Sequence, residues 1–184
     1  MNIVLVGFMA SGKSAVGRRL AKRLGYKLLD MDQALEESAG VPVATIFAEK
    51  GEAAFRRMET EWLDSLTQVD NHVFSTGGGI LTTPGNMERL KRLGPVVFLN
   101  ADLDDILLRL ANDTRRPLVQ RLRESGQDLR TSLQALLEQR LPLYMQADIV
   151  IPTLGKTPNT VAGELIGAIS RYLSQQAQQV GAKP

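Results

Sequence analysis

The chain contains no cysteine and only one histidine, His72. Without cysteine there can be neither a disulfide framework nor a thiolate metal site, and this composition is compatible with a reducing compartment. His72 precedes a strand-like run and has no cysteine or aspartate cluster of metal-binding spacing near it. We therefore expect His72 to be structural or solvent-facing, and we exclude a disulfide-stabilised scaffold.

The chain also lacks a large net charge and any long apolar run. Its 22 basic and 20 acidic residues leave a formal charge of +2 and are spread along the sequence, so the footprint of a nucleic-acid binder is missing. No apolar run approaches the ~20 residues of a membrane span, and Met1 leads directly into a strand-like run. We expect a monomeric cytoplasmic protein without nucleic-acid or membrane partners.

Apolar periodicity predicts alternating strands and helices. The length of 184 residues, with 43% hydrophobic composition, suits one compact domain. Short apolar runs predict buried strands, and longer amphipathic stretches between them predict helices, which together indicate an α/β fold with a mostly parallel sheet. The expected strands are 2–6, 26–29, 73–76, 96–99 and 149–151, and the expected helices are 13–24, 43–67, 84–93, 103–110, 129–141 and 160–174.

Two segments depart from this pattern. Residues 111–127 carry four arginines between two helical patterns, and a polar connection of that length is usually functional or disordered. Residues 175–184, rich in glutamine and alanine, are expected to form a frayed C-terminal tail. The predicted organisation is therefore a single domain over residues 1–174 followed by this tail.

The strongest motif is Gly7-Phe8-Met9-Ala10-Ser11-Gly12-Lys13-Ser14, which fits the P-loop pattern G-x-x-x-x-G-K-[ST] between a predicted strand and a predicted helix. Such a loop turns backbone N–H groups toward phosphate oxygens, and the helix N-terminus adds partial positive charge. Lys13 would reach the β- and γ-phosphates, and the Ser14 hydroxyl would bind Mg²⁺. The motif predicts nucleotide binding without specifying the reaction.

Asp30 and Asp32 follow at the carboxyl end of the second predicted strand, where ligands bind in open parallel sheets. One carboxylate could serve the metal while the other faces an acceptor hydroxyl. Helix N-capping by Asp32 is an equally good interpretation.

Two further patterns have both a structural and a functional interpretation. Arg56 and Glu59 are three residues apart on a predicted helix interrupted at Gly51, and this spacing alone favours a surface ion pair. Three glycines, Gly77 to Gly79, follow the third strand and indicate either a flexible turn or a close backbone approach.

Taken together, these motifs resemble the shikimate kinase family. The P-loop, D-M-D, I-F-x-x-x-G-E-x-x-F-R-x-x-E, T-G-G-G, R-P-L and R-x-P-L-Y occur in the family's order and approximate spacing, from residue 3 to about residue 158. The resemblance implies Mg²⁺-dependent transfer of the ATP γ-phosphate to the 3-hydroxyl of shikimate, in the pathway to aromatic amino acids. It also implies a three-layer P-loop fold, similar to nucleoside monophosphate kinases, with a five-stranded parallel sheet of order 2-3-1-4-5 and a mobile lid.

The resemblance also assigns roles to residues. Asp32 would orient the shikimate hydroxyls, and Asp30 would hold Mg²⁺ through water, alongside Ser14. Arg56 and Arg140 would clamp the substrate carboxylate, for which guanidinium groups suit better than lysine. The remaining substrate-binding positions, within a region at about 32–60 and in the glycine turn, would be Glu59, which orients Arg56, and Gly77, Gly78 and Gly79.

On the nucleotide side, the resemblance places a lid at about residues 111–127, with Arg116 stabilising charge on the transferred phosphoryl group. Arg109 would stack on adenine, although a solvated helix face explains Arg109 about as well. Lys156 would belong to the adenine-binding loop, where Pro152 replaces the acidic residue common in the family. The nucleotide-binding positions are then Ala10, Ser11, Gly12, Lys13, Ser14, Ala15, Arg109, Arg116 and Lys156.

Other functions fit the sequence less well. A P-loop kinase of another small acceptor, such as gluconate, would keep the P-loop and the lid but should lack F-R-x-x-E combined with T-G-G-G. A GTPase switch would need an N-K-x-D motif, which does not occur. Intact Lys13, Ser14, Asp30, Asp32 and Arg116 argue against a protein that binds the metabolite without turnover.

Overall fold

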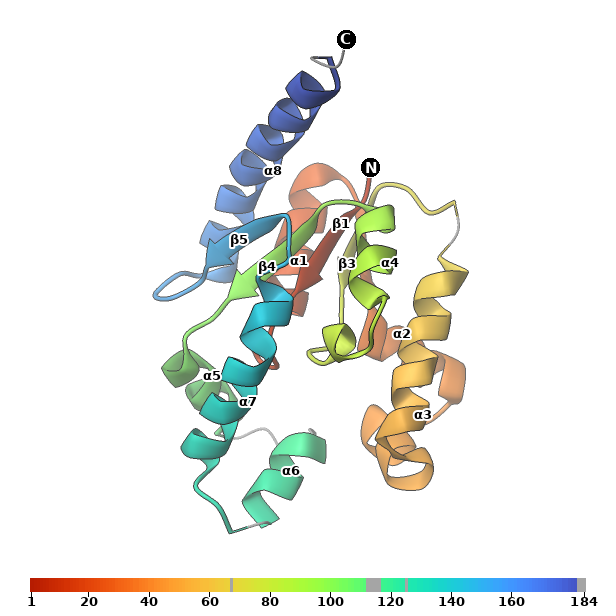
Figure 1. The fold of residues 1–184 in the computed structure, drawn as a ribbon, viewed down its shortest axis with the longest axis vertical. Helices are drawn as coiled ribbons and strands as arrows, with labels where there is room; N and C mark the ends of the chain where they lie inside the picture. Colours follow the sequence, from red (N-terminus) through yellow and green to blue (C-terminus); the bar gives the residue numbers. More distant parts are fainter. Residues whose placement is uncertain (67, 112–116, 125, 182–184) are drawn as a thin grey trace.

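The computed structural model describes residues 1–66, 68–111, 117–124 and 126–181. Its centre is a parallel five-stranded sheet of order β2-β3-β1-β4-β5 (Figure 1). This order confirms the prediction from the family resemblance. The strands are β1 (Ile3–Val6), β2 (Lys27–Asp30), β3 (His72–Ser75), β4 (Val96–Asn100) and β5 (Ile149–Pro152).

Helices cover both faces of the sheet (Figure 1). In chain order they are α1 (Lys13–Leu24), α2 (Met31–Ala39), α3 (Val43–Ser65), α4 (Asn86–Leu93), α5 (Leu103–Leu110), α6 (Pro117–Glu124), α7 (Leu129–Tyr144) and α8 (Pro158–Gly181), with a short 3₁₀ turn at Ile80–Thr82.

The alternation of side chains along β1 divides the core into two layers. Ile3 and Leu5 pack with apolar residues of α1 and α8, whereas Val4 and Val6 pack with those of α3, α4, α5 and α7. All four side chains are fully buried, as expected for a central strand of a parallel sheet. Because the five strands are parallel, their carboxyl ends lie at the same end of the sheet, where the loops after β1, β2 and β3 lie together.

Two helices were not expected from the sequence. Helix α2 buries only Met31 and Leu35, and α6 lies within the polar segment that appeared irregular. Asp32 lies in the first turn of α2, while Asp30 holds the N-cap position without a side-chain capping bond, so the capping interpretation of Asp32 was wrong.

The predicted boundaries were otherwise close, with one exception at the C-terminus. Helix α8 continues to Gly181 and passes the end of the strands in Figure 1, so residues 175–181 are helical rather than frayed. The predicted interruption at Gly51 is present: α3 has non-helical angles there (φ 77°, ψ 170°), which glycine adopts without steric cost. Among the described helices, none combines the length and apolarity needed to cross a membrane.

Candidate active site

The P-loop connects β1 to α1 at the point where the strand order reverses direction, the usual ligand position in an open parallel sheet. Lys13 begins α1 and is largely buried, yet its ammonium turns back over the loop. Lys13 Nζ donates hydrogen bonds to the carbonyls of Gly7 (2.8 Å) and Phe8 (3.0 Å) and lies 3.4 Å from Ser11 Oγ. These bonds hold a positive charge against the loop that would enclose phosphate groups.

Ser14, Asp30 and Ser75 form an oxygen-rich group beside the P-loop. Ser14 Oγ donates a 2.5 Å hydrogen bond to Asp30 Oδ2 and lies 3.2 Å from Ser75 Oγ. Asp30 and Ser75 are register partners at the ends of β2 and β3, so the sheet itself brings them together. The described residues contain no group of three or more histidine, cysteine, aspartate or glutamate side chains that could hold a metal without other ligands.

A polar cleft runs along the P-loop, and Arg109 closes one side of it. Arg109 Nη1 donates a 2.9 Å hydrogen bond to the Ala10 carbonyl, and Nη2 pairs with Asp105 at 3.3 Å. The Arg109 guanidinium is therefore hydrogen-bonded to the P-loop. Arg109 does not simply lie on a solvated helix face, the alternative interpretation from the sequence. The lining residues are Ala10, Gly12, Lys13, Ser14, Ala15, Asp30, Asp32, Ser75, Thr76, Gly78 and Arg109.

Two predicted nucleotide-site residues within the described structure, Ser11 and Lys156, do not line this cleft, and Ser11 is buried within the P-loop. Lys156 lies between β5 and α8, where its ammonium pairs with Glu164 at 2.7 Å, and it is not among the lining residues. Arg116, and Arg115 beside it, lie outside the described residues.

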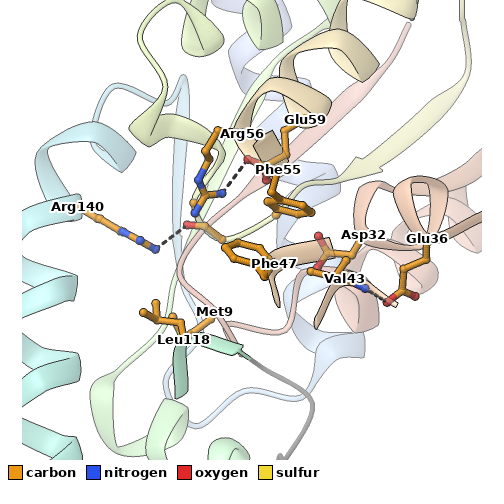
Figure 2. A pocket seen from close by; sticks show the side chains of 13 residues that line it. Met9, Asp32, Glu36, Val43, Phe47, Phe55, Arg56, Glu59, Leu118 and Arg140 are labelled. Atoms are coloured by element: carbon orange, nitrogen blue, oxygen red, sulfur yellow. Dashed lines mark hydrogen bonds and ion pairs between the residues drawn. The ribbon is translucent and has the colours of Figure 1, made fainter. Parts of the chain in front are cut away.

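A second cleft adjoins the first, between the α2–α3 region and the α6–α7 region (Figure 2). It combines apolar and aromatic walls with two arginines and three carboxylates. Phe47 and Phe55 form one wall, with ring centroids 4.6 Å apart. The lining residues are Met9, Asp32, Glu36, Val43, Phe47, Phe55, Arg56, Glu59, Gly77, Gly78, Gly79, Leu118 and Arg140.

Arg56 and Glu59 form a buried ion pair on α3, seen as a dashed line in Figure 2. Arg56 Nη1 donates a 2.7 Å hydrogen bond to Glu59 Oε2, and Nη2 donates a 3.0 Å bond to the exposed Glu52. Glu59 is wholly buried, so the surface-pair interpretation was wrong. Burial raises the pKa of the Glu59 carboxyl, while the neighbouring Arg56 charge opposes that shift.

The glycine turn after β3 allows these side chains to lie directly against the backbone. A Cβ on Gly77 would stand 2.5 Å from Glu59 Oε1, and one on Gly79 would overlap the Arg56 guanidinium. A Cβ on Gly78 would stand 2.9 Å from the Met9 nitrogen in the P-loop. The predicted close backbone approach is therefore confirmed, and the alternative of a merely flexible turn is not needed.

Helix α7 contacts the same turn from the opposite side. Arg140 Nη1 donates a hydrogen bond to the Gly78 carbonyl at 3.4 Å, and the Tyr144 hydroxyl donates to the same oxygen at 2.5 Å. Tyr144 stacks on Phe98 of β4, and burial raises the pKa of its hydroxyl to about 12. The hydroxyl therefore stays protonated, and remains a donor, over the physiological pH range.

The two clefts share Asp32 and Gly78. A group held beside the P-loop and a second molecule held between Arg56 and Arg140 would consequently meet at these two residues. The structure brings together Lys13, Ser14, Asp30, Asp32, Arg56, Glu59, Gly77, Gly78, Gly79, Arg109 and Arg140, all predicted from the sequence.

Sequence reasoning missed several residues of the second cleft, and also Tyr144, which contacts the glycine turn beside it. Phe47, Phe55 and Tyr144 stood inside quoted motifs but received no role, and Leu118 of α6 was noted only as part of R-P-L. Their signal was the position of large apolar or aromatic residues beside predicted site residues. Tyr144 in particular follows Arg140 by four residues and so shares its helical face.

Comparison with known proteins agrees with this geometry. The family model "Shikimate kinase" matches residues 9–170. The chain is 40% identical to the shikimate kinase of Persephonella marina over 168 residues (91% of this chain, 98% of the relative). It is 42% identical to that of Xanthomonas axonopodis pv. citri over 166 residues (90% and 89%).

Solved structures give the same result. The shikimate kinase of Acinetobacter baumannii in complex with shikimate has a TM-score of 0.83 at 38% identity, with 90% of each chain covered. That of Aquifex aeolicus has a TM-score of 0.75 at 32% identity, covering 99% of this chain and 100% of the other. A gluconokinase from Sinorhizobium meliloti shares the fold at 17% identity and a TM-score of 0.58. The chain belongs to the shikimate kinase family, and so to the kinases that use ATP as phosphoryl donor.

Proposed function

We propose that this protein transfers the γ-phosphoryl group of ATP to the 3-hydroxyl of shikimate, giving shikimate 3-phosphate and ADP. The observation that carries this proposal is the pair of clefts that join at Asp32 and Gly78, one built on a P-loop and the other bearing two arginines. Phosphoryl transfer depends mainly on positioning and charge stabilisation, and this arrangement would place donor and acceptor in contact.

The acceptor is held by charge and by shape. Arg56 and Arg140 line one cleft with apolar walls, which suits a ring-shaped molecule with a planar carboxylate. Glu59 holds Arg56 in orientation through the 2.7 Å bond, and the backbone of Gly77 to Gly79 offers N–H donors to the substrate. Asp32, at the junction of the clefts, orients the acceptor hydroxyl and receives its proton as the new bond forms.

The donor is held by the P-loop. The loop from Ala10 to Ala15 surrounds the phosphates with backbone N–H groups, and Lys13 balances charge on the β- and γ-phosphates. Arg109, which donates a hydrogen bond to the Ala10 carbonyl, would cover the nucleotide base. Arg116 would stabilise the transferred group, and Lys156 would contact the base-binding loop; these two roles rest on the family resemblance alone.

The residues beside the P-loop fit Mg²⁺. This ion prefers hard oxygen ligands and is usually bound by one or two protein groups together with substrate phosphates. Ser14 Oγ and the Asp30 carboxylate, 2.5 Å apart, provide such a set, Ser14 directly and Asp30 through water. When bound, Mg²⁺ would neutralise the negative charge that develops during phosphoryl transfer.

We further propose the organisation in which the protein works. It acts as a cytoplasmic monomer with a single kinase domain that ends with α8, an arrangement expected for a chain with both clefts built on one sheet. Residues 32–60 form the acceptor region and residues 111–127 the lid. Leu118 supports the lid assignment because it lines the acceptor cleft from α6. Covering that cleft would exclude water as a competing acceptor.

The test is an ADP-release assay with ATP and Mg²⁺ that compares shikimate, quinate, gluconate and AMP as acceptors. We expect turnover with shikimate, loss of activity in Lys13→Ala, and a large rise of the shikimate KM in Arg56→Ala. Arg57→Ala removes an exposed arginine next to Arg56 and should behave like the wild type. Faster turnover with another acceptor, or equal behaviour of the Arg56 and Arg57 variants, would contradict the shikimate assignment.

The metal requirement has its own test. Chelation with EDTA should abolish turnover, and Mg²⁺ should restore it. Ser14→Ala should raise the Mg²⁺ concentration needed for half-maximal activity while leaving the binding of shikimate alone unchanged. Full activity in EDTA would refute the metal assignment without affecting the choice of acceptor.

A further inference from the structure

The Gly78 carbonyl is held by side chains of a distant helix, unlike the carbonyls of Gly77 and Gly79. The Gly77 carbonyl accepts a backbone bond from Ile80, and the Gly79 carbonyl accepts bonds from the backbone N–H and the hydroxyl of Thr82, all within the turn itself. The Gly78 carbonyl instead accepts from Tyr144 and Arg140 on α7. The orientation of the peptide after Gly78 therefore depends on a helix more than 60 residues away in sequence.

That peptide is unusually free to rotate in the absence of an external restraint. It lies between two glycines, which impose few steric limits on the flanking torsion angles. Because a peptide is planar and trans, fixing the Gly78 carbonyl also fixes the direction of the Gly79 N–H, which points the opposite way. The N–H groups of this turn are those that the proposed function assigns to the substrate.

The two donors to Gly78 are not equivalent. The Tyr144 hydroxyl lies 2.5 Å from the carbonyl oxygen, whereas Arg140 Nη1 lies at 3.4 Å, near the outer limit of a hydrogen bond. Tyr144 is 1% exposed and stacked on Phe98 with ring centroids 5.0 Å apart, so its hydroxyl has little freedom to turn elsewhere. Tyrosine thus supplies the shorter bond to the carbonyl, while the Arg140 guanidinium lies over the Phe8 ring and also interacts with the Tyr144 hydroxyl.

We propose that Tyr144 is a positioning residue for substrate binding: by satisfying the Gly78 carbonyl, it fixes the glycine turn and leaves the Arg140 guanidinium available to the substrate carboxylate. This inference rests on the proposed function and deepens it. Without the hydroxyl, the buried carbonyl would need another donor, since an unsatisfied buried carbonyl is costly. Arg140, the other donor to this oxygen, would approach from 3.4 Å toward an ordinary distance of about 2.9 Å and withdraw from the substrate.

The direct test is Tyr144→Phe, which keeps the ring and its contact with Phe98 and removes only the hydroxyl. We expect the shikimate KM to rise about tenfold, the effect of losing one well-placed interaction, with kcat and the ATP KM within about twofold of the wild type. Tyr172→Phe is the matched control, because Tyr172 on α8 interacts through its hydroxyl with Asp148, which lines neither cleft. We expect the control to retain wild-type constants.

A double-mutant cycle separates positioning from general stability. If Tyr144 acts mainly through Arg140, then Tyr144→Phe should raise the shikimate KM by a smaller factor in the Arg140→Ala background than in the wild type. A merely structural role would instead lower kcat, raise both KM values and lower the melting temperature together, in either background. Such parallel losses, or an unchanged shikimate KM in Tyr144→Phe, would overturn the inference.

A second variant covers the case in which Tyr144→Phe does not fold. In a Tyr26→Phe/Tyr172→Phe background, 3-fluorotyrosine replaces only Tyr144 and makes its hydroxyl a stronger donor. The shikimate KM should then fall by about twofold relative to the unfluorinated background, and an unchanged KM would count against the inference. Absence of shikimate turnover in the wild type would refute the proposed function itself, an outcome distinct from any difference among variants.

Discussion

Arg56 Nη1 donates a 2.7 Å hydrogen bond to Glu59 Oε2, and the carboxylate that receives it has no exposed surface. The pair lies on one face of α3, three residues apart, and closes one end of the acceptor cleft. A buried carboxylate is tolerated only when its charge is compensated, so each member of the pair depends on the other. Glu59 therefore connects the stability of α3 with the orientation of an arginine in the cleft.

Removal of Glu59 should damage both stability and substrate binding. Glu59→Ala leaves the Arg56 guanidinium buried with only the exposed Glu52 as a partner, and breaking a buried pair in this way costs about 3 kcal/mol of unfolding free energy. The shikimate KM should rise at least tenfold because Arg56 loses its orientation. Urea unfolding and steady-state kinetics would measure the two effects. Glu61→Ala, an exposed position on the same helix, is the control, and equal behaviour of the two variants would refute the role of Glu59.

The buried Tyr144 hydroxyl should make the unfolding free energy of the protein fall at alkaline pH. Burial raises the pKa of its hydroxyl to about 12 in the folded protein, from 10.0 in its ordinary range. Between these two pKa values the unfolded state releases a proton that the folded state keeps. The contribution of the Tyr144 hydroxyl to the unfolding free energy is therefore complete below pH ~10 and is lost as the pH rises toward ~12. The loss amounts to about 1.4 kcal/mol per pH unit within that window.

The comparison of wild type with Tyr144→Phe isolates this contribution. Urea unfolding between pH 8 and 11.5 should show a constant difference in unfolding free energy up to pH ~10. Above that pH, the wild type should lose stability faster than the variant. Parallel curves over the whole range would mean that the hydroxyl is not buried as described.

Much of the fold could be predicted from the sequence because its main elements have strong local signals. Buried parallel strands are continuous apolar runs, and the P-loop fixes where the first strand ends and the first helix begins. Helices α2 and α6 were missed because their few buried side chains acquire partners only in the tertiary structure. The same applies to the C-terminal end of α8, whose polar composition suggested fraying although its residues also favour helix.

Site residues could be predicted where a sequence motif is specific to one kind of chemistry. They were harder to predict where the role of a side chain depends on whether it is buried. The P-loop could be assigned from local sequence, whereas Asp32 fitted a helix N-cap equally well until the family resemblance gave it a role. Arg56 and Glu59 have the same spacing on a buried face as on a solvated one, so spacing alone gave the wrong interpretation, and only the family resemblance indicated their function. The bond between Tyr144 and Gly78 joins residues 66 positions apart, and local sequence contains no signal for it.

The P-loop contains a strained residue whose replacement should be informative. Ala10 has a left-handed backbone (φ 57°), which costs a non-glycine residue about 1 kcal/mol. Ala10→Gly should remove that strain, but it also increases the entropy of the unfolded chain by a similar amount. We therefore expect the unfolding free energy to stay within about 1 kcal/mol of the wild type, with activity retained.

Ala10→Val is the contrasting variant. A β-branched residue is still less compatible with the left-handed region, so stability should fall by more than 1 kcal/mol. The ATP KM should rise, because the Ala10 carbonyl that anchors Arg109 would be displaced. Thermal unfolding and ATP titration would measure both effects. An Ala10→Val variant as stable and active as Ala10→Gly would contradict the strained geometry of the loop.

Gly78 stands where the two clefts meet, and the smallest possible side chain should separate them. The Cβ of alanine at this position would lie 2.9 Å from the Met9 nitrogen and 3.3 Å from its Cα, so the backbone of either the P-loop or the glycine turn must move. A displacement of this size affects donor and acceptor together, and we expect kcat/KM to fall at least 100-fold for both substrates.

Gly167→Ala is the matched control, since Gly167 lies within α8 and a Cβ there would come no nearer than 3.4 Å to the mobile end of Arg171. Alanine favours a helix interior over glycine, so this control should keep full activity and gain up to about 1 kcal/mol of stability. If Gly78→Ala instead retained activity while Gly167→Ala did not, the contact between turn and P-loop could not be what aligns the two substrates.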